Sequence, residues 1–159
     1  MDDPYSSEVP PLAAPEDSPP VRTETALLVR WRQLMGPWGF ERRSLWLLWF
    51  DEDGFQLPIV VPIDDIPDLP DDDMVGRLLQ IAHEVAHVDG SDTGGATVAV
   101  TLSRPGSARV TPSDRAWARA LLGQAAGAGV SLWPVHLATK GTVRPLTLDD
   151  VGWERPRSA

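Results

Sequence analysis

Along the middle of the chain, segments with the hydrophobic spacing of a helix alternate with short apolar segments typical of strands. Residues 71–89, projected at about 100° per residue, place apolar side chains on one broad side of a helix and polar ones on the other. Helical spacing also runs through residues 23–35 and 111–129. Short, mainly apolar runs predict strands at 44–50, 56–63, 96–102 and 131–137, and residues 142–146 are predicted to return as a strand after a turn at 140–141. The pattern therefore predicts the order α-β-β-α-β-α-β-β in a single layered α/β domain.

Turn and cap residues set the ends of several of these elements. Thr111, Pro112 and Asp114 follow the order expected of a helix N-cap, a first-turn proline and an acid near the positive end of the helix dipole. The acidic turn 51–54 ends in a glycine and predicts a hairpin between the first two strands. Two prolines in the second of these strands favour a place at the sheet edge, because proline has no backbone N–H.

Composition divides the chain into three parts. Residues 1–21 are rich in proline and acidic or hydroxyl side chains, which predicts a disordered tail. Residues 22–150 carry the periodic pattern of the domain, and residues 151–159 are expected to be a flexible C-terminus. The chain has seven tryptophans, whose rings supply a core or an interface.

Charge and residue usage exclude several classes of function. The formal net charge of −9 disfavours nucleic acid as a partner, because duplex-binding domains normally present a basic face. The absence of cysteine excludes disulfides, thiolate ligands and cysteine nucleophiles. No apolar run approaches about 18 residues, and the acidic N-terminus does not resemble a signal peptide. We therefore expect a cytoplasmic protein with no membrane-spanning segment.

The run HEVAHVDGSD (residues 83–92) is the strongest chemical motif. It reads HExxHxxGxxD, in which His83, His87 and Asp92 would bind zinc and Glu84 would serve as general base. In this frame it resembles small metzincin peptidases. The alternative is that these residues are the solvated face of an amphipathic helix. That alternative is favoured because the methionine turn of metzincins has no counterpart after the motif. No cofactor is thus the main expectation, and zinc is the alternative.

A second resemblance covers about residues 42–147. The run TLSRPGSARVTPSDRAW (101–117) resembles the His-x-His-Pro-Ser-Gly loop and Thr-Pro-Ser-x-x-Asp helix start of the RadC-type JAB (JAMM, MPN) domain. The resemblance implies a three-layer JAB/MPN-type fold, with a mixed sheet and flanking helices. The two histidine positions fall on Leu102 and Arg104, and the ligand aspartate falls on Ala116. Ser113 keeps its place in the helix start, but a metal centre of that kind is missing.

These observations lead to one main hypothesis on function. The chain is expected to be a non-catalytic JAB/RadC-like interaction or scaffolding module. It would act through the tryptophan-rich hairpin or the degenerate loop 102–114 on an unidentified protein partner, or on a second copy in a homodimer. Arg104, Arg115 and Arg119 are candidate contacts for an acidic peptide or a phosphate.

Two alternatives to an interaction module stay open. One is a small zinc-dependent hydrolase using the HEVAH motif. The weaker one is a nucleic-acid-binding protein associated with DNA repair, suggested by the RadC likeness alone. His136 is expected to be a buried histidine bonded to backbone, in preference to a member of a catalytic triad with Ser103 or Ser113.

Overall fold

The computed structural model of the chain describes residues 18–35, 42–87 and 96–146. Within these ranges the chain forms three helices and five strands in the order predicted from the sequence. They are α1 (Glu24–Met35), β1 (Ser44–Phe50), β2 (Gln56–Asp64), α2 (Asp72–Ala86), β3 (Thr97–Ser103), α3 (Pro112–Ala125), β4 (His136–Thr139) and β5 (Thr142–Pro145).

The strands form one open, mixed sheet in the order β2-β1-β3-β4-β5. Neighbouring strands are antiparallel except for β3 and β4, which are parallel. A parallel pair needs a crossover connection, and α3 supplies it. The strand β2 lies at one edge, as its two prolines predicted.

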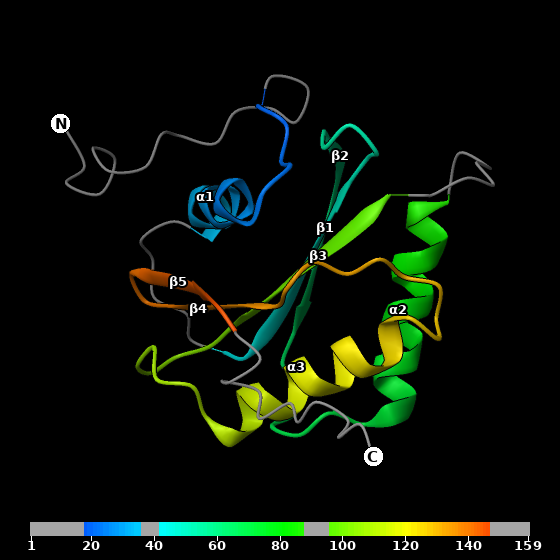
Figure 1. Cartoon of the computed structure of the whole chain (residues 1–159). Coiled ribbons are helices and arrows are strands. Elements are labelled where there is room, and N and C mark those ends of the chain that lie inside the picture. Colours follow the sequence, from blue (N-terminus) through cyan, green and yellow to red (C-terminus); the bar gives the residue numbers. More distant parts are fainter. Residues whose placement is uncertain (1–17, 36–41, 88–95, 147–159) are drawn as a thin grey trace, which may run out of the picture.

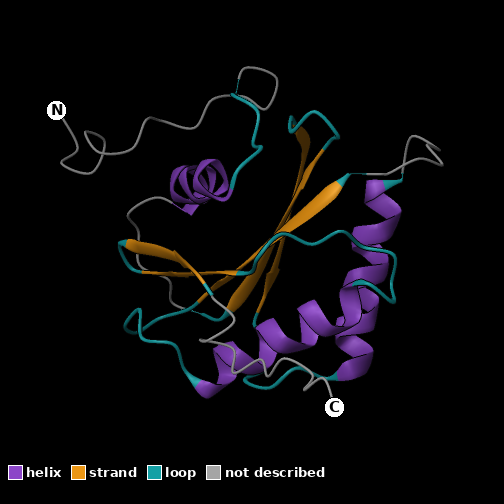
Figure 2. Ribbon diagram, viewed as in Figure 1, coloured by secondary structure: helices purple, strands orange, loops and turns teal. Residues whose placement is uncertain are grey.

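Helices cover both faces of the sheet, so the domain has three layers. Figures 1 and 2 show α1 on one side of the sheet and α2 with α3 on the other. Side chains alternate along β1, so that Leu48 and Phe50 pack with α1 whereas Leu47 and Trp49 pack with α2 and α3. Tryptophan contributes to both layers: Trp31 and Trp117 are fully buried on opposite faces. The predicted α/β architecture is confirmed.

The predicted strand at residues 131–137 is wrong in its position. Only His136–Thr139 forms β4, and the preceding segment touches β3 through a single parallel bridge between Leu132 and Val98. The ladder is interrupted at Pro134, which has no N–H to donate. The partner offset along β3 grows by one residue across this point, from Val98↔Leu132 to Thr101↔His136. One extra residue is therefore accommodated there, as in a bulge.

Residues 18–21, which the sequence assigned to the tail, pack against the domain. Val21 is 2% exposed, and its N–H donates to the carbonyl of Gly54 at 2.7 Å. The carbonyl of Pro19 accepts from the guanidinium of Arg30. The predicted end of the helix over residues 71–89 lies outside the described residues. The described helix α2 ends at Ala86, with His87 as its C-cap.

Candidate functional site

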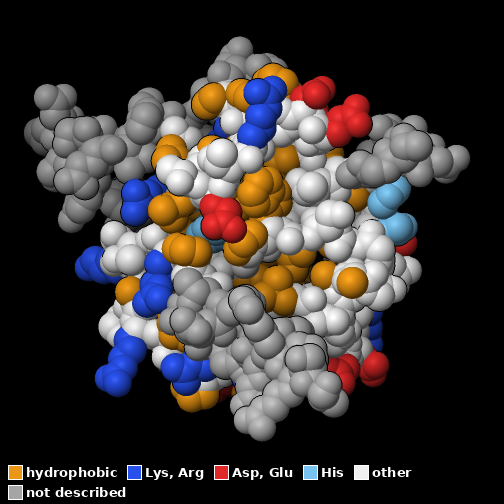
Figure 3. Space-filling view, in the orientation of Figure 1, with side chains coloured by type: hydrophobic (Ala, Val, Ile, Leu, Met, Phe, Trp, Pro, Cys, Tyr) orange, Lys and Arg blue, Asp and Glu red, His pale blue; other side chains and the backbone are white. Residues whose placement is uncertain are grey.

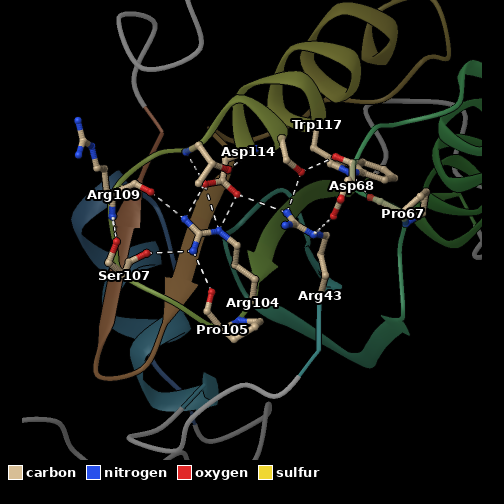
Figure 4. Close-up of polar contacts among 11 residues, drawn as sticks. Arg43, Pro67, Asp68, Arg104, Pro105, Ser107, Arg109, Asp114 and Trp117 are labelled. Atoms are coloured by element: carbon tan, nitrogen blue, oxygen red, sulfur yellow. Dashed lines mark hydrogen bonds and ion pairs between the residues drawn. The ribbon is translucent and has the colours of Figure 1, made fainter.

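The residues of loop 102–114 meet where β3 ends and α3 begins. Figure 4 shows the guanidinium of Arg104 facing the carboxylate of Asp114. Arg104 Nη2 donates to Asp114 Oδ2 at 2.7 Å, and Nε donates to Oδ1 at 2.9 Å. Both side chains are buried, with Arg104 5% and Asp114 0% exposed. This is a bidentate, charge-assisted pair of the strong kind.

The remaining donors of Arg104 bind the loop that surrounds it. Nη1 donates to the carbonyls of Pro105 and Ser107, at 3.0 and 2.9 Å, and Nη2 donates to that of Arg109 at 2.8 Å. All five guanidinium N–H groups thus have acceptors within the chain. Arg104 fixes the path of residues 105–109 and is not an exposed contact residue, which corrects its expected role at the surface.

Asp114 belongs to both the charged pair and the start of α3. Its carboxylate accepts from the N–H of Thr111 at 2.9 Å, while Thr111 Oγ1 accepts from the N–H of Asp114 at 3.2 Å. The two residues form a capping box, which confirms the predicted helix start. Burial by itself raises the pKa of the Asp114 carboxyl. The hydrogen bonds from Arg104 and Thr111 outweigh that effect and hold its pKa below the ordinary value.

A second arginine, missed at the level of sequence, extends this network. Arg43 precedes β1, and its Nη1 lies 2.8 Å from Ser113 Oγ and 3.7 Å from Asp114 Oδ1. Its Nε lies 3.4 Å from a carboxylate oxygen of Asp68. Ser113 donates in turn to the carbonyl of Asp68. Arg43 and Ser113 are 70 positions apart, so no local signal could have indicated the contact. The network ties the β2–α2 loop to the start of α3.

The positions that resemble metal ligands carry no ligand side chains. Leu102 is 2% exposed and packs in the core between sheet and helices. Ala116 is half-buried on α3. Leucine and alanine have no donor atoms for a metal, and the guanidinium of Arg104 would repel one. The residues present therefore do not fit the metal centre that the JAB resemblance would imply.

The HEVAH histidines lie at the other end of the helical layer. His83 and His87 are half-buried near the C-terminus of α2, and Glu84 is exposed with Oε1 3.4 Å from Gln80 Nε2. Asp92 lies outside the described residues. Among the described residues, no group of three or more His, Cys, Asp or Glu side chains could hold a metal ion. The described part of the motif thus offers two imidazole rings as possible metal ligands.

The other candidate residues lie in different parts of the structure. His136 is 1% exposed, and its Nδ1 lies 3.1 Å from the carbonyl of Pro134, as predicted for a histidine bonded to backbone. Ser103 Oγ accepts from Trp46 Nε1 at 2.9 Å. Arg115 and Arg119 are exposed on α3, one turn apart. These side chains thus give no nucleophile–base pair.

Comparisons with family models, with curated proteins and with solved structures find no match for this chain. Among the described residues, no helix is both long and apolar enough to cross a bilayer.

Proposed function

We propose that this chain is a non-catalytic JAB/RadC-like module that acts by binding another protein. The observation that carries the proposal is the buried Arg104–Asp114 pair. The resemblance assigns the position of Arg104 to a metal-binding histidine. Here the same position holds a fixed organic cation, which is satisfied by a carboxylate and three backbone carbonyls. The buried pair keeps the loop in a defined shape, and neither Leu102 nor Arg104 can hold a metal ion that would activate water.

The contact surface proposed for the partner is the outer part of the β1–β2 hairpin. Val60 is 37% and Phe55 41% exposed, and Pro58 and Pro62 are also exposed. The register places Pro62 beside the half-buried Trp46. We call these five residues the hairpin surface. Clustered apolar side chains with an aromatic ring are typical of a contact site.

The prolines of the hairpin surface restrict how a partner can bind. An exposed edge strand normally offers N–H and C=O groups to an added strand. Pro58 and Pro62 provide no N–H, so β2 cannot present a continuous ladder. The partner is therefore expected to dock through side-chain packing instead of strand addition.

The matched pair Val60→Glu and Ile81→Glu tests the surface. Both residues are exposed β-branched side chains, 37% and 43%, and Ile81 lies on α2 across the sheet. Proteins crosslinked to the purified chain in extract of its own cells should be lost with Val60→Glu and retained with Ile81→Glu. Equal loss, or no loss, in both variants would contradict a contact at the hairpin surface.

A gain-of-function variant tests the JAB-like ancestry of the loop. Leu102→His, Arg104→His and Ala116→Asp together restore the three ligand types that the resemblance assigns. In a His83→Ala, His87→Ala background, zinc should bind to the triple variant but not to the parent in calorimetric titration. If the variant is unfolded alone, zinc should restore its far-UV circular dichroism, since ligation drives folding. A folded triple variant without zinc affinity would contradict the resemblance.

A further inference from the structure

The two HEVAH histidines form a pair that the proposed interaction function does not use. His83 lies in the last turn of α2 and His87, four residues later, is the C-cap, so the two rings lie on the same side of the helix end. Their ring centroids are 4.2 Å apart and the ring planes are tilted by 32°. Figure 3 shows histidine side chains gathered at the surface at the right of the view, where α2 ends in Figure 1. The pair is thus accessible from solvent.

The hydrogen bonds of the two rings determine which nitrogen is left to act as a ligand. His83 Nδ1 lies 3.2 Å from the carbonyl oxygen of Gly129, and His87 Nδ1 lies 2.8 Å from that of His83. A carbonyl oxygen only accepts, so each Nδ1 carries the proton. Each neutral ring then holds its lone pair on Nε2. Such a bond from the opposite nitrogen is how proteins orient metal-binding imidazoles.

The bond to Gly129 depends on the turn that follows α3. Gly129 has φ +70°, a left-handed conformation that favours glycine. A Cβ at this position would lie only 3.2 Å from His83 Nδ1. Glycine therefore lets the backbone carbonyl approach the ring closely. The turn after α3 fixes the orientation of His83, and the last turn of α2 fixes that of His87.

The chemistry of the pair restricts the ion that it can bind. Imidazole nitrogen suits zinc, copper and nickel, whereas calcium and magnesium require oxygen ligands. No salt bridge to His83 or His87 is present among the described residues. Water can complete the coordination of an ion that the two imidazoles hold.

We propose that His83 and His87 chelate a divalent zinc, copper or nickel ion through their Nε2 atoms. The site binds metal without catalysing hydrolysis and does not require Glu84. It lies beside the turn that follows α3, whereas the Arg104–Asp114 pair lies at the start of this helix, which is about 20 Å long. Both ligands lie at the end of α2, so bound metal holds this end of the helix and stabilises the folded state, with a gain that grows as the logarithm of metal concentration above the Kd.

The test uses the full chain without a purification tag, titrated with zinc or nickel chloride in a calorimeter. The expected result is one ion per chain and a Tm that rises with metal concentration. Both effects should disappear in His83→Ala and in His87→Ala. Magnesium chloride should produce neither effect, which separates this site from non-specific binding to the acidic surface.

Two further variants keep the proposal falsifiable. Gly129→Ala retains both imidazoles but disturbs the carbonyl contact, so zinc affinity should fall about tenfold. Glu84→Gln should leave zinc affinity unchanged. Zinc binding that survives in the double variant His83→Ala, His87→Ala would overturn the proposal, and so would half an ion per chain. Peptide hydrolysis that Glu84→Gln abolishes would replace it with the hydrolase alternative.

Discussion

At the scale of residues, the buried pair of Arg104 and Asp114 fixes the conformation of the loop after β3. Arg104 lies in a sequence run that resembles a metal-binding loop, yet its guanidinium binds Asp114 and the carbonyls of its own loop. Each group compensates the desolvation of the other. Removing one partner would leave a buried charge without compensation, which costs far more than the pair contributes net.

Arg104→Met is therefore expected to lower the free energy of unfolding by about 3–5 kcal/mol. Urea titration followed by circular dichroism measures the change. Arg77→Met, an exposed substitution of the same kind on α2, should change it by less than about 0.5 kcal/mol. Similar small effects of both variants would show that the buried pair does not hold the loop.

His136 makes stability depend on pH. Burial lowers its pKa from 6.5 to about 4, and the hydrogen bond to the Pro134 carbonyl offsets only part of that effect. The unfolded chain therefore takes up the proton first as the pH falls. The free energy of unfolding should fall between pH 6.5 and pH 4 by about 3 kcal/mol.

His136→Gln should remove this dependence, because the side chain no longer titrates. Urea midpoints measured at several pH values between 4 and 6.5 give the slope for both proteins. Asp114 affects the free energy of unfolding only at lower pH. Its pKa is held below the ordinary 3.8, so its stabilising contribution is lost as the pH falls below that value. Equal slopes in the two proteins would assign the pH dependence to other groups.

At the scale of elements, the turn of the β1–β2 hairpin also anchors the N-terminal segment. Gly54 has φ +89°, and its carbonyl accepts from the N–H of Val21. A Cβ at Gly54 would lie 2.5 Å from the carbonyl oxygen of Val21. The sequence predicted a turn that ends in this glycine, but the approach of residues 18–21 depends on tertiary contacts.

Gly54→Ala and Gly141→Ala together separate backbone strain from steric contact. Both glycines have positive φ, but a Cβ at Gly141 meets nothing within 4 Å. Gly141→Ala should cost about 1 kcal/mol for the left-handed conformation alone. Gly54→Ala should cost at least about 1 kcal/mol more, measured by urea titration. Equal costs would indicate that residues 18–21 move away easily.

For the whole molecule, one sheet joins two hydrophobic cores. Leu47 packs with α2 and α3, whereas its neighbour Leu48 packs with α1. The same strand thus contributes to both cores, and the two layers are expected to unfold together.

Leu47→Ala and Leu48→Ala, in residues 3% and 0% exposed, should each destabilise the chain by about 2–5 kcal/mol. Both should shift one transition, with coincident curves for tryptophan fluorescence and circular dichroism. A separate, earlier transition in Leu48→Ala would show that the α1 layer unfolds independently.

The sequence by itself determined the order of elements, the helix start at Thr111, the edge position of β2 and the polar face of α2. These features depend on residues close together in the chain: hydrophobic period, cap chemistry and the missing N–H of proline. The strand at 131–137 was misplaced because Pro134 interrupts a ladder whose partner, β3, lies far away in sequence.

Only the tertiary structure decided how the candidate site residues are used. Arg104 could have faced solvent, but the fold places Asp114 and three carbonyls around it. The partner of His83 is Gly129, 46 residues away. The packing of distant segments determines which polar groups are buried and which atoms remain available as ligands. Hydrophobic pattern and motif spacing depend only on residues close together in the chain, so they do not predict this packing.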